Sequence, residues 1–416
     1  MTDRNNPVEK KRSTASGQSG PEAKNCCAAG PTEMLPIYRP PADRPVAEED
    51  VPCCGPPAGP PSSRDEKPGY TLCGFVEDFL LTAAGPVPRV KTGLTREDSL
   101  GMLRARLGIG RNHYKVAPGL YALGRPDTDS PVLATANYKL SFDQLRSSLE
   151  DADAWLLILD TRGINVWCAA GKGTFSTAEV IERVRLSCLD KVIRHRRLIL
   201  PQLGASGVSA REVRKGCGYE IVWGPVRAAD IKAFLAAGLK AEEAMRRVTF
   251  SMGERMVLVP VEVALTRKPL LWALLAIFVL SGIGPHVFSL SAAWERGAMA
   301  ALACLAGVLA GSVAVPCLLP WIPGRAFAVK GTLSGLVMGA AAVSAMAANP
   351  WLTLISGTSL ILLAVVASSY VAMNFTGATP FTSPSGVEKE MRRAIPLQFV
   401  AALAATGLWI AAAFVR

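Results

Sequence analysis

The stretch WLLILDTRGINVWCAAGKG, residues 155 to 173, places an apolar run of strand length directly before a short segment with one cysteine and a Gly-Lys-Gly ending. Trp155 to Asp160 has the continuous apolar character of a buried strand. Four further runs are of the same kind: Val132 to Ala136, Leu198 to Leu200, Glu220 to Trp223 and Met256 to Val263. Helix-like stretches lie between most of them, so the pattern predicts an α/β, Rossmann-like domain with a largely parallel sheet.

Capping and stop signals mark the helices of this domain. Two pairs fit the capping box, in which side chains satisfy free N–H groups of the first turn: Ser141 with Gln144, and Ser176 with Glu179. Two glycines are typical of helix ends: Gly216 and Gly238. Because such sheets bind ligands at the carboxyl ends of their strands, the quoted segment is expected at the ligand-binding edge.

Composition divides the 416 residues into three parts. Residues 1–69 are rich in Pro, Gly, Ser and charge without apolar periodicity, which predicts a disordered extension and no secretory signal. Residues 70–265 form the α/β part. Residues 266–416 contain five apolar runs long enough to cross a bilayer, which predicts an all-α transmembrane domain: 270–289, 297–319, 326–348, 351–373 and 395–414.

Basic residues at the ends of these runs predict their orientation. Seven lie on one set of flanks: Arg267, Lys268, Arg325, Lys330, Lys389, Arg392 and Arg393. The opposite flanks hold Arg296 and Arg416. Seven against two predicts a multi-pass protein of the cytoplasmic membrane, with the α/β domain in the cytoplasm and the C-terminus outside. Part of the net charge of +11 is therefore an orientation signal, and nothing in it calls for nucleic acid.

The cysteine and glycine patterns exclude several kinds of site. The ten cysteines contain no C-x-x-C spacing, which argues against zinc ribbons, haem attachment and ordinary iron–sulfur clusters. The three histidines, His113, His195 and His286, lie far apart in sequence. Gly-Lys-Gly is not a phosphate loop, because Gly173 follows Lys172 where Ser or Thr is needed.

The segment around Cys168 has the features of a short helix with a reactive thiol. If Asn165 is the N-cap, Cys168 falls at N3, where the helix dipole and free N–H groups lower a thiol pKa. Ala169 and Ala170 would leave a low, flat surface, and Gly171 with Gly173 would end the helix. An exposed sulfur on such a surface suits an axial ligand to a planar macrocycle, while an ordinary buried cysteine is the alternative.

The stretch DTRGINVWCAAGKGTFST, Asp160 to Thr177, resembles the cap-helix motif of mercury-methylating corrinoid proteins. Similar segments occur in the large subunit of the corrinoid iron–sulfur protein. Three further stretches match the same family: Val116 to Leu140, Leu200 to Ile231 and Asn374 to Met391.

The resemblance implies a cobalamin-type corrinoid bound base-off, with Cys168 as the lower axial ligand of cobalt. The rest of the cap would be Asn165, Val166, Trp167, Ala169, Ala170, Gly171, Lys172 and Gly173. Thr135 and Asn137 are further candidates around the corrin. Their alternative role is to satisfy backbone groups at the end of a strand.

The resemblance also implies a reaction and partners. A methyl group from a methyltetrahydrofolate-dependent donor would reach cobalt and pass to Hg(II), and a dicluster 4Fe–4S ferredoxin would re-reduce the cobalt. The five membrane runs and the lack of closely spaced cluster cysteines favour the mercury-methylating relative over the iron–sulfur one. A corrinoid methyl carrier of one-carbon or acetyl-CoA metabolism, with a different acceptor, is the alternative.

Two further segments invite a functional hypothesis. The vicinal pairs Cys26–Cys27 and Cys53–Cys54 would suit a soft ion such as Hg(II), although cysteines in a flexible tail can be incidental. The polar loop predicted from Asn374 to Arg393 lies on the same predicted side as the α/β domain. It would cover the cofactor, dock the ferredoxin, or serve as a plain connector.

Overall fold

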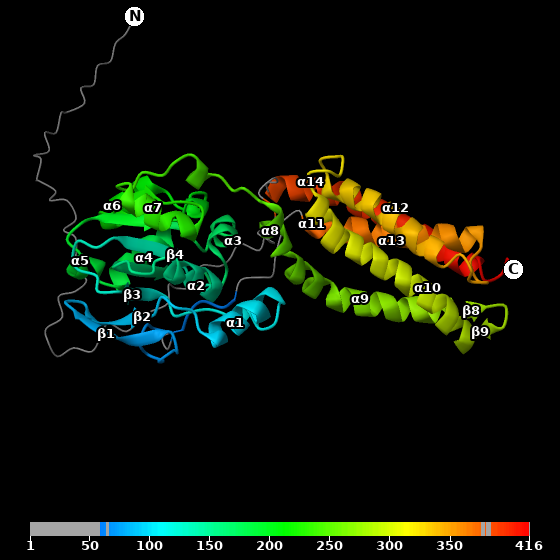
Figure 1. The fold of residues 1–416 in the computed structure, drawn as a ribbon, viewed down its shortest axis with the longest axis horizontal. Coiled ribbons are helices and arrows are strands. Elements are labelled where there is room, and N and C mark those ends of the chain that lie inside the picture. The colour runs from blue at the N-terminus through cyan, green and yellow to red at the C-terminus, as the bar shows by residue number, and fades with distance from the viewer. Residues whose placement is uncertain (1–58, 64–65, 376–378, 380–383, 416) are drawn as a thin grey trace, which may run out of the picture. The chain divides into compact units, whose positions relative to one another are not determined.

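A computed structural model describes residues 59–63, 66–375, 379 and 384–415. They comprise an α/β region with a mostly parallel sheet and, after it in the chain, a helical region (Figure 1). This confirms the predicted fold class. Cys26, Cys27, Cys53 and Cys54 lie outside the described residues.

Seven strands form the main sheet in the order β1-β2-β3-β5-β4-β6-β7. Their bounds are β1 Val76–Thr82, β2 Gly85–Val90, β3 Gly119–Leu123, β4 Val132–Ala136, β5 Ala154–Leu159, β6 Arg197–Leu200 and β7 Glu220–Trp223. Strands β5, β4, β6 and β7 are parallel to their neighbours in this series, whereas β3 runs antiparallel to β5 and β1 antiparallel to β2. The parallel part therefore presents its carboxyl ends at one edge.

The sequence identified the parallel strands and misassigned one later segment. The predictions for β4, β5, β6 and β7 are confirmed to within a residue at each end. The sequence did not predict β1, β2 and β3. Residues 256–263 were expected to be a strand. They are helical instead, ending α8 (Met252–Met256) and beginning α9 (Val259–Ser281), because Pro260 is compatible with a first helical turn and the apolar run continues into a long helix.

Helices cover both faces of the sheet. They are α1 Arg96–Arg106, α2 Lys139–Ser147, α3 Val166–Gly171, α4 Thr177–Leu186, α5 Leu189–Val192, α6 Ala210–Cys217 and α7 Ile231–Ala236. Alternate residues of β5 enter two separate cores. Leu157 packs in the core that contains Val180 of α4, whereas Leu156 packs in the core that contains Phe142 of α2 and Phe234 of α7.

The predicted helix boundaries are partly confirmed. Ser176 is the N-cap of α4 and accepts a hydrogen bond from the Glu179 N–H group. Ser141 lies inside α2 instead, because that helix begins at Lys139 after Tyr138. Gly238 follows α7 with φ +66°, as predicted for a helix end. Gly216 instead lies within α6, which ends at Gly218 with φ +78°.

Within the described part of the helical region, five helices are long and apolar enough to span a membrane: Met252–Ser281, Leu290–Leu318, Phe327–Ala345, Leu354–Phe375 and Gly386–Ala411. The helices are α9, α10 Leu290–Leu309, a π-helical turn Ala310–Ala314, α11 Val315–Leu318, α12 Phe327–Ala345, α13 Leu354–Phe375 and α14 Pro384–Ala411. The chain is thus suited to a multi-pass membrane protein.

Two segment boundaries differ from the sequence prediction. The first apolar run was expected to stay helical to residue 289, but α9 ends at Ser281 and a hairpin follows, β8 Ile283–Gly284 and β9 Val287–Phe288. The polar loop was expected to end at Arg393. Residues 384–393 belong to α14, whereas residues 376–378 and 380–383 lie outside the described part.

Glycines allow α12 and α13 to approach closely. Gly331, Gly335 and Gly339 recur every four residues, so they lie on one face of α12. A Cβ atom at Gly335 would lie 2.7 Å from Cβ of Ser368, and one at Gly339 would lie 2.9 Å from Cβ of Ala364. Small residues at such a crossing bring the backbones together, which is how helices associate in a lipid environment.

Arg296 is buried in α10 and bonds to backbone carbonyls. One terminal nitrogen donates to the carbonyl oxygens of Ser281 (3.0 Å) and Ile283 (3.1 Å), and the other donates to that of Trp409. The guanidinium carbon also lies 4.8 Å from the Trp409 ring centroid. This residue, which the sequence assigned to an external flank, therefore links α9, α10 and α14.

Lys330 is a second buried cation within a candidate span. Its ammonium group donates to the carbonyl oxygens of Leu319 (2.9 Å) and Ile322. The apolar run predicted from 326 to 348 therefore contains a buried ionisable side chain. If Arg296 and Lys330 are counted as buried residues of the helical region, six basic residues remain on the predicted cytoplasmic flanks and one on the opposite flanks.

Candidate functional site

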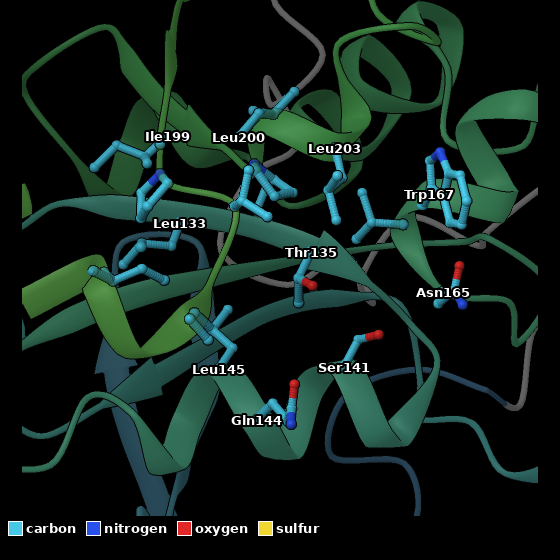
Figure 2. Close-up of a pocket in the computed structure, with 18 of the residues that line it drawn as sticks. Leu133, Thr135, Ser141, Gln144, Leu145, Asn165, Trp167, Ile199, Leu200 and Leu203 are labelled. Atoms are coloured by element: carbon cyan, nitrogen blue, oxygen red, sulfur yellow. The ribbon is translucent and has the colours of Figure 1, made fainter. Parts of the chain in front are cut away.

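A cavity of about 330 Å³ lies at the carboxyl edge of the parallel strands (Figure 2). Strand β4 connects through α2 to β5 on one side, and the chain then crosses to β6 on the other side, so the topology changes direction between β4 and β6. Ligands of open α/β sheets bind at such a point. The cavity is lined by Leu133, Ala134, Thr135, Tyr138, Leu140, Ser141, Gln144, Leu145, Asn165, Val166, Trp167, Ile199, Leu200, Pro201, Leu203, Gly224, Pro225, Val226, Ala228 and Ile231.

Helix α3 begins beside this cavity, and its start is as predicted. The Asn165 side-chain oxygen accepts a hydrogen bond of 2.9 Å from the Cys168 N–H group, so Asn165 is the N-cap and Cys168 is N3. The helix ends at Gly171, and Gly173 follows with φ +71°. The predicted short helix is therefore present, and its first turn lies at the carboxyl edge of the parallel strands.

The Cys168 thiol is partly exposed, and its pKa differs from the sequence prediction. Burial raises the pKa of this thiol above its ordinary value, while Lys172, the hydrogen bond with Asn165 and Arg111 act in the opposite direction. The sequence predicted a lowered pKa from the helix terminus. Desolvation outweighs the positive surroundings, so the prediction is wrong for the free thiol.

The two alanines after Cys168 pack into the core of the α/β region. Ala169 is fully buried and Ala170 is nearly so, in the same cluster as Phe175. A Cβ atom at Gly207 would lie 3.2 Å from Cβ of Ala170. The predicted flat surface of alanines is therefore wrong; these residues attach α3 to the domain. Trp167 is exposed and lines the cavity, so it supplies the apolar surface instead.

Thr135 and Asn137 have different environments. Thr135 lines the cavity at the end of β4. Asn137 is fully buried, and its side-chain oxygen accepts from the Thr161 N–H (3.1 Å), the Thr161 hydroxyl (2.9 Å) and the Gly163 N–H (3.0 Å). Its amide nitrogen donates to Asp160 at 3.1 Å. Asn137 thus holds the loop between β5 and α3, which is its alternative, structural role.

Asp160 and Glu179 support this loop, a role that the sequence did not predict. Glu179 was expected only as the capping-box partner of Ser176, and its N–H group donates to Ser176 as expected. The Asp160 carboxylate accepts from the N–H groups of Ser62 (2.8 Å) and Arg162 (3.1 Å) besides Asn137. The Asp160 N–H group donates to the Glu179 carboxylate at 2.7 Å. Burial raises the pKa of Glu179, although Arg183 opposes this shift. The only available signal was the position of Asp160 directly after a strand.

Residues 59–62 contact the same loop. The Gly59 N–H group donates to the Arg162 carbonyl oxygen at 3.2 Å, in addition to the bond from Ser62 to Asp160. A Cβ atom at Gly59 would lie 3.1 Å from that oxygen, so the approach is close. The sequence assigned these residues to the extension, yet they bond to the segment that leads into α3.

Comparisons with known proteins relate the α/β region to corrinoid proteins. Residues 102–235 match the family model described as CO dehydrogenase/acetyl-CoA synthase delta subunit. This range includes β3 to β7, the cavity and α3.

Individual relatives give the same picture. The chain is 32% identical over 127 residues to the acetyl-CoA decarbonylase/synthase complex subunit gamma of Methanopyrus kandleri, which covers 30% of this chain and 27% of that protein. It is 29% identical over 193 residues to the corrinoid/iron-sulfur protein large subunit of Moorella thermoacetica, covering 42% of this chain and 43% of that one.

The similarity covers part of each relative. The match to the gamma subunit of Methanothermobacter thermautotrophicus is 28% over 174 residues and covers 36% of that protein. The chain thus spans less than half the length of these curated relatives, and the similarity identifies a shared region and not a shared whole.

Proposed function

We propose that this chain is a membrane-anchored corrinoid protein in which Cys168 is the lower axial ligand of cobalt. The observation that carries the proposal is the position of this thiol at N3 of α3, in a region related to corrinoid proteins. The three residues before it, Asn165, Val166 and Trp167, line the cavity at the switch point, whereas Cys168 is not among the lining residues. The five long apolar helices supply the anchor.

The residues present fit such a cofactor. A cysteine sulfur is a soft ligand suited to a transition metal, and Cys168 is a free, partly exposed thiol. The neighbouring cavity, at about 330 Å³, lies at the lower end of small-molecule sites. A corrinoid is larger than this volume, so the cavity would take part of it, with Thr135, Asn165, Val166 and Trp167 as lining residues.

A bound corrinoid would supply a cobalt centre able to accept and release a methyl group. The chain would supply the sulfur and fix its position. Asn165 holds the backbone of Cys168 through the N-cap bond, while the buried Ala169 and Ala170 attach α3 to the core. Lys172 favours the thiolate, which the metal would stabilise against the cost of burial. Gly171 and Gly173 leave the end of α3 exposed.

The proposed acceptor is Hg(II), giving methylmercury. It is supported by the resemblance of Asp160 to Thr177 to the cap segment of mercury-methylating corrinoid proteins. The donor would depend on methyltetrahydrofolate, and a dicluster 4Fe–4S ferredoxin would supply electrons. The base-off form of the corrinoid, a cytoplasmic α/β region and an external C-terminus belong to the same proposal, the last two supported by basic flanks.

A second candidate is a membrane-bound methyl carrier with a different acceptor. The gamma-subunit relatives favour it, because they are named as parts of an acetyl-CoA decarbonylase/synthase complex. Both candidates use the same cofactor and the same sulfur.

Full-length protein purified in detergent and loaded with a methylated corrinoid tests the proposal. We expect a corrinoid absorption spectrum with a sulfur-ligated cobalt signature, and methylmercury on addition of Hg(II) and a low-potential ferredoxin. Cys168→Ala should abolish the sulfur signature and the product, whereas Cys188→Ala, at another partly exposed cysteine, should leave both intact.

The outcomes separate the candidates. Failure of the protein to bind any corrinoid rejects both. A sulfur-ligated corrinoid that transfers no methyl group to Hg(II) rejects the mercury acceptor and leaves the carrier role. Nitrogen or water below cobalt rejects the assigned role of Cys168.

A further inference from the structure

Helix α1 has its apolar side chains outside and its polar contacts inside. Leu100 and Leu103 are 55% and 52% exposed, and Leu107, at the C-cap, is also exposed. The residues that face the domain are Asp98, Gly101 and Ala105, of which Asp98 and Ala105 are the buried ones. At about 100° per residue, the three leucines lie opposite this inner face.

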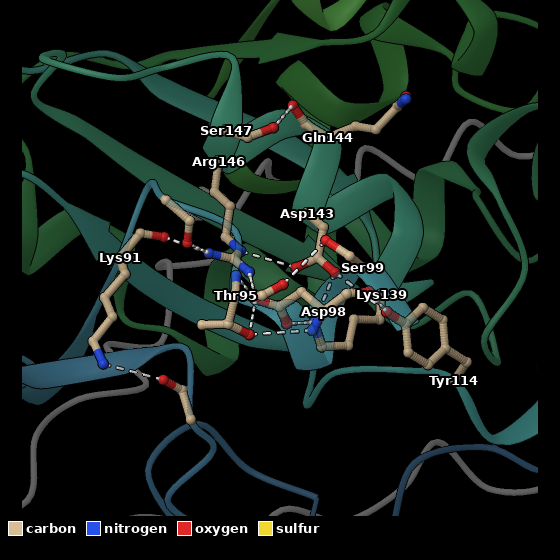
Figure 3. A network of polar contacts seen from close by, with 12 residues as sticks. Lys91, Thr95, Asp98, Ser99, Tyr114, Lys139, Asp143, Gln144, Arg146 and Ser147 are labelled. Atoms are coloured by element: carbon tan, nitrogen blue, oxygen red, sulfur yellow. Dashed lines mark hydrogen bonds and ion pairs between the residues drawn. The ribbon is translucent and has the colours of Figure 1, made fainter. Parts of the chain in front are cut away.

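A buried charge network fixes α1 in this orientation (Figure 3). The Asp98 carboxylate bonds to the Lys139 ammonium group at 2.6 Å and to the Arg146 guanidinium group at 2.8 Å. Both cations also bond to Asp143, at 2.7 and 2.8 Å. Thr95 and Asp98 form a reciprocal capping box at the start of the helix. Rotation that turned the leucines inward would break all of these bonds.

Close packing against Tyr114 gives a second constraint. A Cβ atom at Gly101 would lie 2.7 Å from the Tyr114 hydroxyl oxygen, so a side chain at that position would displace the ring. Helix α1 is therefore already packed on its own domain, and its leucines remain exposed in that packed state. They are a fixed apolar surface, with Ile109 exposed in the turn that follows.

We propose that this face of α1 docks on the surface of the lipid bilayer that the chain itself spans. Leu100, Leu103 and Leu107 would enter the interface between headgroups and acyl chains. The helix of 11 residues is too short to cross a bilayer and would lie along it. This inference does not depend on the corrinoid or on mercury.

Charge and connectivity favour lipid as the occupant. Arg96 is exposed beside the leucines, and Arg104 and Arg106 flank them, against one exposed acidic residue of α1, Glu97. The excess of positive charge is typical of interfacial helices that bind anionic lipids. The five candidate spans in the same chain keep a bilayer at high effective concentration near the α/β region. A soluble partner protein would have no such advantage.

Photocrosslinking of the full chain in nanodiscs tests the proposal. A benzophenone amino acid replaces Leu103 in one variant and exposed Lys215 of α6 in the control. The discs contain phosphatidylcholine with phosphatidylglycerol, or phosphatidylcholine alone. We expect lipid adducts at position 103, about tenfold more than at position 215, with a lower yield in discs without the anionic lipid.

A second variant protects the test against a folding artefact. With the benzophenone at Leu100, Leu103→Asp should reduce lipid adducts about tenfold, because a charge opposes insertion, while amide protection of α2 stays unchanged. Adducts with a second protein copy, or equal lipid yields at positions 103 and 215, overturn the proposal. So does an undiminished yield in Leu103→Asp.

Discussion

The two regions of this protein bury positive charge in different ways. In the α/β region, Arg146 is fully buried between the carboxylates of Asp98 and Asp143. In the helical region, Arg296 and Lys330 are buried against backbone carbonyl oxygens. Arg146 also donates to the carbonyl oxygens of Lys91 and Gly93, so the difference is that the α/β region adds carboxylate partners, whereas Arg296 and Lys330 bond to backbone carbonyl oxygens.

The difference follows from what each region leaves unsatisfied. The last carbonyl groups of a helix have no partner within it and carry a partial negative charge. Ser281 is the last residue of α9, and Leu319 follows directly after α11, so both carbonyls are of this kind. A cation that binds these carbonyl oxygens satisfies the end of a helix, and it requires no second ionised group in an apolar surrounding.

The largest expected effect is at Arg146. Arg146→Met would leave Asp98 and Asp143 buried with one cation fewer, which we expect to lower the free energy of unfolding of the α/β region by about 3 to 5 kcal/mol. Chemical denaturation of the full chain in detergent, followed by hydrogen exchange in β4, measures this. The control is exposed Arg211→Met in α6. A loss no greater than that of the control would contradict the role of the network.

The next largest loss of stability is expected at Asn137, a neutral side chain that supports the loop before α3. Asn137→Ala removes the acceptor of three donors and should destabilise the loop before α3 by about 3 kcal/mol. Because this loop leads into α3, alkylation of Cys168 in the cofactor-free protein should become about tenfold faster. If the alkylation rates of Cys168 and of the control Cys217 both stay unchanged in Asn137→Ala, the loop does not position the Cys168 thiol.

Arg296 should show a smaller effect than Arg146. Arg296→Met leaves neutral carbonyl oxygens unpaired instead of carboxylates, so we expect a loss of about 2 kcal/mol in the helical region. The measurement is thermal unfolding of the full chain, read from exchange of amides in α10 and α14. A loss equal to or above that of Arg146→Met would remove the distinction between the two modes of burial.

Acid should destabilise the two regions unequally, and the difference in stability between them should be smallest at mildly acidic pH. Burial acts to raise the pKa of Asp98, but hydrogen bonds from Lys139, Thr95 and Arg146 outweigh it and hold the pKa well below its usual range. A lowered carboxyl pKa contributes stability that is present above the unfolded pKa of about 4 and is lost as pH falls further. Carbonyl partners do not titrate.

Exchange of amides in α1 and α2 should therefore accelerate below about pH 4, relative to α10, after correction for intrinsic rates. Asp98→Asn should reduce this acid dependence. Parallel acceleration of α1 and α10 in the unmodified chain would contradict the assigned cause.

The parallel strands and the cap helix could be predicted because their signals are local. Strands β4 and β5 are continuous apolar runs, and Asn165 lies three residues before Cys168. Strands β1 and β2 were not predicted because exposed residues, such as Asp78 and Pro86, interrupt the apolar pattern. The segment from Met256 alternates apolar and other residues like a strand, yet its continuation into α9 decides its helical state.

The supporting contacts of the site could not be predicted because they join distant residues. Asn137 bonds to groups 23 to 26 positions later, and Ser62 bonds to Asp160 98 positions later. The lowered pKa expected for Cys168 failed for a related reason. Position N3 is visible in the sequence, whereas the burial that raises the pKa comes from the assembled domain.

The outward leucines of α1 have a practical consequence for protein production. A truncated form that ends before α9 would keep Leu100, Leu103 and Leu107 at its surface, held there by the Asp98 network. Such a fragment would tend to self-associate or adsorb to detergent micelles even when correctly folded. Polar replacements at these three positions, with Asp98 left intact, are therefore the way to obtain a monodisperse soluble fragment.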